Sequence, residues 1–208
     1  MQESNKNNFN HLKIHTQYSI CEGAIKISDL KDYCRENNIK SAGLSDTSNL
    51  CGSLEFSENL SKSGTQPIIG TQILFNFKGD VGLLSLIAKS ESGYKRIVEL
   101  SSKSYLDNDK NIDPQCSFKD LLEEPNDLIL LSGSINGLIG KLFNKGKFFE
   151  IEEIYKAIKA TYQDNFYIEI QRHDDLNEKS FENYNLNLSK KLNLPIIATH
   201  EVYYLDKS

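Results

Sequence analysis

The sequence predicts an α/β protein built as a distorted β/α barrel. Segments typical of strands alternate along the chain with segments typical of helices, and this alternation favours parallel strands joined by right-handed crossovers. Polar residues follow the carboxyl ends of several predicted strands, where a barrel would bring them into one mouth. No G-x-G-x-x-G motif follows the first predicted strand, so a doubly wound sheet is the less favoured alternative.

The expected elements follow from hydrophobic periodicity and from turn residues. Strands are predicted at residues 9–15, 41–46, 68–77, 83–88, 127–132, 165–171 and 195–199. Helices are predicted near residues 28–38, 50–63 and 94–105, after Ser117, between 134 and 164 (one or two), and at 174–193. Ser28, Ser117 and the run 47–49 are the predicted helix caps. A turn is expected at Gly79-Asp80 and a loop at 106–115.

Length and composition exclude several classes of protein. A chain of 208 residues is long enough to bury a core, and its net charge of −5 argues against a broad phosphate-binding face. The four cysteines are far apart without a C-x-x-C pair, so we expect them to be reduced. The polar opening residues predict no signal peptide, and no apolar run approaches the ~20 residues of a membrane span. A soluble, cytoplasmic protein is therefore expected.

The stretch from Phe9 to Ala24 carries an unusual polar cluster. In an extended conformation, alternate side chains share a face, so His11, Lys13 and His15 would lie together opposite Leu12 and Ile14. Strand ends further along the chain add more polar residues to the expected mouth: Asp46, Gln72, Ser134, His173, His200 and Glu201. This clustering predicts a site at the mouth of the barrel.

Five segments together resemble the polymerase and histidinol phosphatase (PHP) domain, in the form found at the amino terminus of bacterial DNA polymerase III alpha subunits. They are H-L-K-I-H-T-Q-Y-S (11–19), S-D-T-S-N-L-C-G (45–52), K-S-E-S-G-Y (89–94), L-L-S-G (130–133) and I-A-T-H-E-V-Y-Y (197–204). The resemblance covers nearly the whole chain from Phe9 and implies a distorted barrel of about seven strands. It also implies a single domain over residues 9–208 behind a polar tail at 1–8, with the last barrel element missing after Ser208.

Metal-binding members of the family hold a cluster of divalent ions at the barrel mouth, and such a cluster activates water for phosphoester hydrolysis. Carried over by resemblance, the remaining ligand positions are His15, Asp46, His173 and Glu201, the last standing where the family has aspartate. Five positions depart from the family pattern: Lys13, Thr47 and Tyr203 replace histidines, Gln72 replaces a glutamate and Ser134 replaces a cysteine. His200 stands where the family has asparagine.

Lys13 is the decisive departure. An ammonium group has no lone pair for a metal and repels the ion. We therefore expect no full metal cluster and no catalytic residue, with at most one weakly held Zn²⁺ or Mn²⁺ at the remaining ligand positions. We expect Lys13 instead to neutralise Asp46 and Glu201 through a salt bridge.

The resemblance implies the role of the parent polypeptide, a DNA-directed DNA polymerase that would use Mg²⁺ elsewhere in its chain. The domain itself would be a structural module that docks a separate proofreading exonuclease subunit and contacts other replicase subunits. DNA would be bound through the rest of the parent chain, and no membrane would be involved. The alternative is an active metal-dependent phosphoesterase or 3′–5′ proofreading exonuclease, and Lys13 and Tyr203 both argue against it.

Overall fold

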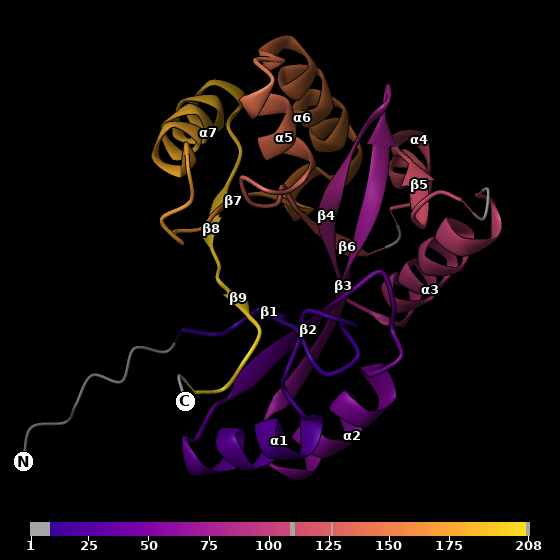
Figure 1. The fold of residues 1–208 in the computed structure, drawn as a ribbon, viewed down its shortest axis with the longest axis vertical. Coiled ribbons are helices and arrows are strands. Elements are labelled where there is room, and N and C mark those ends of the chain that lie inside the picture. The colour runs from indigo at the N-terminus through magenta and orange to yellow at the C-terminus, as the bar shows by residue number, and fades with distance from the viewer. Residues whose placement is uncertain (1–8, 109–110, 126, 207–208) are drawn as a thin grey trace, which may run out of the picture.

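A computed structural model describes residues 9–108, 111–125 and 127–206 (Figure 1). The predicted tail at 1–8 lies outside these residues. The described strands are β1 (Lys13–Ile14), β2 (Ser41–Thr47), β3 (Gln66–Phe77), β4 (Asp80–Ala88), β5 (Gln115–Ser117), β6 (Leu128–Leu131), β7 (Phe166–Ile170), β8 (Ile196–Ala198) and β9 (Glu201–Val202). The helices are α1 (Ile27–Glu36), α2 (Ser53–Lys62), α3 (Glu91–Leu106), α4 (Phe118–Leu122), α5 (Leu138–Asn144), α6 (Phe148–Tyr162), α7 (Glu178–Leu192) and the 3₁₀ turn η1 (Gln163–Asn165).

The strands form one sheet that curls into a distorted barrel. Its order is β8-β7-β6-β4-β3-β2-β1-β9, and β5 pairs with β3 beside this path. The two edge strands, β8 and β9, are separated in the chain only by Thr199 and His200. The two edges of the sheet are thus consecutive parts of one extended segment, which Figure 1 shows running from β7 down to β1. The predicted distorted barrel is confirmed.

Strand pairing is mainly parallel, as expected, with β4 as the exception. It runs antiparallel to both β3 and β6. The connection from β3 to β4 is the two-residue turn Lys78-Gly79, in which both residues have positive φ (52° and 90°). Two positive φ values in a two-residue loop match the twist of a tight hairpin. The predicted turn at Gly79-Asp80 is therefore one residue too late.

Two of the three predicted helix caps are wrong. Ser117 forms a capping box with Asp120 at the start of α4, as predicted. Ser28 is not a cap, because α1 already begins at Ile27 and the Ser28 hydroxyl donates to Asp29. The run 47–49 does not cap α2 either, since that helix begins six residues after Thr47 and follows Gly52.

Two predicted boundaries also shift. The helix expected from Asp174 starts at Glu178, because Asp174 and Asn177 have positive φ and the Glu178 carboxylate accepts the backbone N–H groups of His173 and Asp174. The loop expected at 106–115 is shorter on both sides, since α3 includes Leu106 and β5 begins at Gln115. The short strand β9 was not predicted as an element of its own.

The apolar core has two parts. The larger cluster surrounds β3, β4, β6 and β7 and includes Phe75, Leu86 and Tyr155, while the smaller includes Leu44 and Phe56 between β2 and helices α1 and α2. In Figure 1, α1 and α2 lie at one end of the molecule and α5, α6 and α7 at the other. None of the helices in the described ranges is long and apolar enough to cross a membrane.

Candidate functional site

Lys13 lies at the centre of the site as a buried ion pair. Its ammonium is 3.0 Å from Oε1 of Glu169 on β7 and 2.5 Å from Oε1 of Glu201 on β9, and only 2% of its side chain is exposed. Burial alone would lower the pKa of Lys13, but the charges of Glu169 and Glu201 outweigh burial and raise the pKa above its ordinary value. The lysine is therefore a fixed positive charge inside the barrel.

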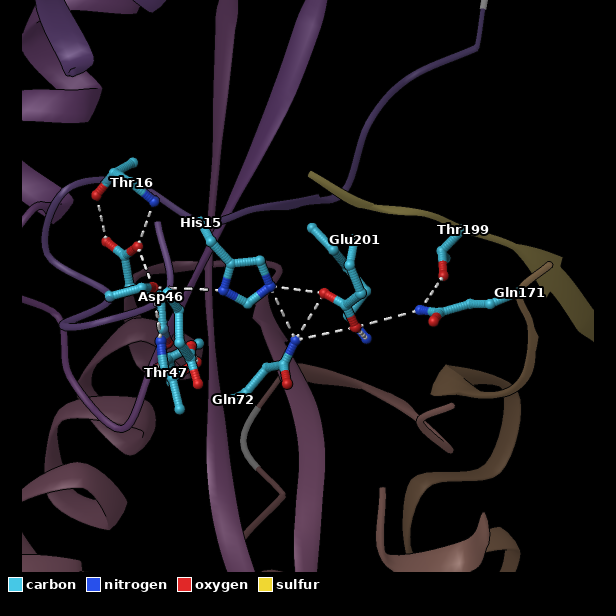
Figure 2. Close-up of polar contacts among 12 residues, drawn as sticks. His15, Thr16, Asp46, Thr47, Gln72, Gln171, Thr199 and Glu201 are labelled. Carbon is cyan, nitrogen blue, oxygen red and sulfur yellow. Dashed lines mark hydrogen bonds and ion pairs between the residues drawn. The ribbon is translucent and has the colours of Figure 1, made fainter. Parts of the chain in front are cut away.

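The Glu201 carboxylate contacts hydrogen-bonding side chains from several strands. Its carboxylate accepts hydrogen bonds from Nε2 of Gln72 (3.0 Å) and Nε2 of Gln171 (3.2 Å), and it lies 2.6 Å from Nε2 of His15 (Figure 2). Burial would raise the pKa of Glu201, but the charge of Lys13 and the hydrogen bond with His15 lower it to about 2. The carboxylate remains ionised, and it ties β9 to β1, to β3 and to the end of β7.

Glu169 is the site residue that the sequence prediction missed. Its carboxylate accepts the backbone N–H of Gly133 at 3.0 Å, Nε2 of Gln171 at 2.7 Å and the hydroxyl of Thr199. The sequence carried a signal, because Glu169 is an acidic residue within an otherwise apolar predicted strand, and the structure shows that it is buried. Charged side chains are rarely buried without a partner, so this position points to a buried cation.

Asp46 is held by neutral donors instead of Lys13. One carboxylate oxygen accepts the backbone N–H of Thr16 (2.7 Å) and the hydroxyl of Ser19 (2.8 Å), and the other accepts the Thr16 hydroxyl (2.8 Å). Figure 2 shows this group on the far side of His15 from Glu201. The expected salt bridge between Lys13 and Asp46 is therefore wrong, whereas the one between Lys13 and Glu201 is present.

The remaining predicted positions are spread around the site. The Thr47 hydroxyl donates to Glu22 at 2.6 Å, and the ring of Tyr203 stacks on His15 with 4.4 Å between centroids. The ring of His173 stacks on His200 at 4.2 Å, and its Nε2 has no hydrogen-bond partner among the described residues.

A cleft of about 280 Å³ opens above the buried ion pairs. The predicted mouth residues that line it are Lys13, Gln72, Ser134, His173, Glu201 and Tyr203. His15 and Asp46 do not line it, and His200 borders a different cavity. The expectation that all the polar strand ends share one mouth is thus correct only in part.

These residues do not fit a divalent metal cluster. Within the described part of the chain, no group of three or more His, Cys, Asp and Glu side chains is placed to hold an ion. The carboxylates of Glu169 and Glu201 are engaged by the Lys13 ammonium, which cannot act as a ligand. The remaining ligand positions stay a prediction that metal analysis would test.

Comparison with known proteins establishes the family of this chain. The model of the family described as "PHP domain" matches residues 11–173, and this chain belongs to that family. The fold is also that of a crystal structure from Bifidobacterium adolescentis, with a TM-score of 0.62 and 11% identity over 95% of this chain and 88% of that one. A two-domain protein from Bacteroides vulgatus, titled as containing a predicted PHP-like metal-dependent phosphoesterase, gives a TM-score of 0.59 and 13% identity over 93% of this chain and 51% of that one.

Relatives found by sequence similarity point to a particular protein within this family. The chain is 34% identical over 203 residues to DNA polymerase III subunit alpha of Rickettsia bellii, covering 96% of this chain and 17% of the relative. It is 34% identical over 212 residues to DNA polymerase III subunit alpha of Caulobacter vibrioides, covering 98% of this chain and 18% of the relative. The predicted resemblance to this subunit is confirmed, and the chain spans less than a fifth of the length of these relatives.

Proposed function

We propose that this chain serves as the PHP domain of a replicative DNA polymerase III alpha subunit, that it has lost hydrolytic activity, and that it acts as a structural module on which a proofreading exonuclease docks. DNA synthesis, with its Mg²⁺ ions, would belong to the rest of the polypeptide, which would work in the cytoplasm. Similarity to alpha subunits over nearly the whole chain supports this assignment.

The observation that carries the inactive role is the Lys13 ion pair. In a hydrolytic site of this kind, carboxylates and imidazoles would bind metal ions that activate water. Here the lysine ammonium lies between Glu169 and Glu201 and neutralises them in place of an ion. A buried cation in this position opposes metal entry, both by repulsion and by occupying the oxygen atoms that would coordinate the ion.

Metal analysis combined with a nuclease assay tests the inactive role. The purified chain is dialysed against Zn²⁺ or Mn²⁺, analysed for bound metal, and incubated with 3′-labelled single-stranded DNA and with a phosphomonoester. We expect less than one ion per chain and no hydrolysis above a blank carried through the same purification. Two or more ions per chain, or hydrolysis that follows the protein through successive columns, would establish the alternative of an active metal-dependent phosphoesterase or exonuclease.

Co-purification tests the docking role. The chain should retain the proofreading exonuclease subunit from its own genome, and a polymerase lacking residues 1–208 should not. Retention of the exonuclease by the polymerase that lacks residues 1–208, but not by the chain, would refute docking on this domain. The acidic balance of the chain opposes strong DNA binding, so the retained complex should survive nuclease treatment.

A further inference from the structure

A second cavity, of about 460 Å³, lies between helix α1 and the segment that follows β8. Its apolar walls come from β1, α1 and β9, and include Ile14, Leu30 and Val202. The segment 200–204 separates this cavity from the cleft above Lys13, since Glu201 and Tyr203 border both. The proposed function makes no use of this cavity.

Aromatic and imidazole rings form much of the remaining wall. They are His11, Tyr33, His173, His200, Tyr203 and Tyr204. Tyr33 and Tyr204 stand at the surface, with 38% and 55% of the residue exposed. The faces of tyrosine rings carry negative potential and attract organic cations.

Among the described residues that line the cavity, acidic side chains are the only ones with a permanent charge. Asp206 supplies a carboxylate, whereas the carboxylate of Glu201 is already paired with Lys13, and neither lysine nor arginine is present among the described residues that line the cavity. Asp206 forms no ion pair with any other described residue. The chain as a whole carries a net charge of −5, which adds to the attraction for a basic group.

Two ring nitrogens at this cavity lack a hydrogen-bond partner. Within the described ranges, Nδ1 of His11 and Nε2 of His173 are buried and unpaired. A neutral imidazole can present a lone pair, so this wall can accept a hydrogen bond from a cationic donor.

We propose that this cavity receives a lysine or arginine side chain of a partner protein, with its stem along the apolar wall and its charged end between the tyrosine rings and Asp206. The volume exceeds that of one such side chain, so an adjacent apolar residue of the partner would enter as well. Nucleic acid is disfavoured, because its phosphates would meet the Asp206 carboxylate and neither lysine nor arginine among the described lining residues. The proposal gives the partner chemistry for the docking role above and rests on that part of the proposed function.

Capped amino acids test the recognition chemistry. Nα-acetyl-lysine methylamide and its arginine counterpart are titrated into the chain, with the norleucine compound as the neutral match, while the ring C–H signals of the four histidines are followed by NMR. We expect the basic probes to shift His11 and His200 saturably and to bind at least about threefold more tightly than norleucine. Equal binding of norleucine, or no saturable shift, would overturn the proposal.

Variants locate the site. Asp206→Asn should weaken binding of the lysine probe by about two- to fivefold, as expected for a partly exposed charge pair. Tyr33→Leu should weaken it as well, whereas Tyr105→Leu, a half-exposed tyrosine on α3, should not. Weaker binding by Tyr105→Leu would contradict a site at this cavity. Unchanged binding by both Asp206→Asn and Tyr33→Leu would contradict it as well.

The full-length polymerase and the exonuclease separate the possible occupants. If the probe binds the 208-residue chain but not the full-length polymerase, the protein's own polypeptide fills the cavity and the partner is excluded. If Asp206→Asn leaves retention of the exonuclease unchanged, the exonuclease docks elsewhere; this inference fails and the proposed function stands. If the Asp206→Asn variant folds normally and retains less exonuclease, the result supports both this inference and the proposed docking role.

Discussion

Lys13 on β1 and Glu169 on β7 form a buried ion pair of 3.0 Å between two strands that share no backbone hydrogen bonds. In the sheet, β1 lies next to β2 and β9, while β7 lies next to β6 and β8. The pair therefore crosses the point where the two edges of the sheet meet. This electrostatic contact links β1 to β7 directly, beside the short edge strands β8 and β9.

Lys13→Met should destabilise the domain by roughly 3–5 kcal/mol, because it leaves Glu169 and Glu201 buried without their cation. Denaturant unfolding at pH 7 measures the loss. Lys62→Met, which removes an exposed lysine paired with Glu58 at 3.6 Å, should change the free energy of unfolding by less than about 1 kcal/mol. Equal stability of the Lys13 variant and wild type would mean that the buried pair contributes nothing to the fold.

Acid should remove the contribution of Glu201. Its pKa falls from 4.5 to about 2 on folding, so the stabilisation is complete above pH 4.5 and is lost as the pH falls toward 2. The free-energy difference between wild type and Glu201→Gln should shrink by about 3 kcal/mol across that range. The pKa of Lys13 is raised, so its contribution is present at neutral pH and is lost only in strong alkali. A difference independent of pH between 5 and 2 would contradict the ion pair.

Asp46→Ala should cost about 2–4 kcal/mol, because it leaves two hydroxyl donors and the backbone N–H of Thr16 without an acceptor. Asp46→Asn, which retains one acceptor oxygen, should cost less. Thermal melts with and without EDTA separate this role from metal binding. If Asp46 acts only through hydrogen bonds, EDTA leaves the melting temperature of wild type unchanged, whereas a fall of several degrees would indicate a bound ion.

Two serines predicted as caps should behave differently. Ser117→Ala should lower the free energy of unfolding by about 1 kcal/mol, since it removes one half of the capping box with Asp120. Ser28→Ala should have almost no effect, because Ser28 lies inside α1 and makes no cap hydrogen bond. Chemical denaturation of both variants tests the pair, and equal losses would contradict the helix start at Ile27.

Local patterning in the sequence was sufficient for most of the fold. The alternation of strand and helix patterns, the largely buried apolar strand β6 and the cap at Ser117 depend on residues close together in the chain, so they could be predicted. The polar face shared by Lys13 and His15 also follows from alternation along one strand. It was the resemblance to the PHP family, and not local patterning, that identified Lys13 as the residue that argues against a metal cluster.

Tertiary structure alone decided which groups meet. Glu169 is 156 positions from Lys13 in the chain, and their contact depends on how β7 and β1 approach where the barrel closes. The same register directs Asp46 toward Thr16 and Ser19 and leaves Glu201 to Lys13. Sequence patterning determined which side chains enter the barrel, because alternation within a strand is a local property. Closure of the sheet determined the pairing of charges, because the distance between strand ends far apart in sequence is set by the whole fold.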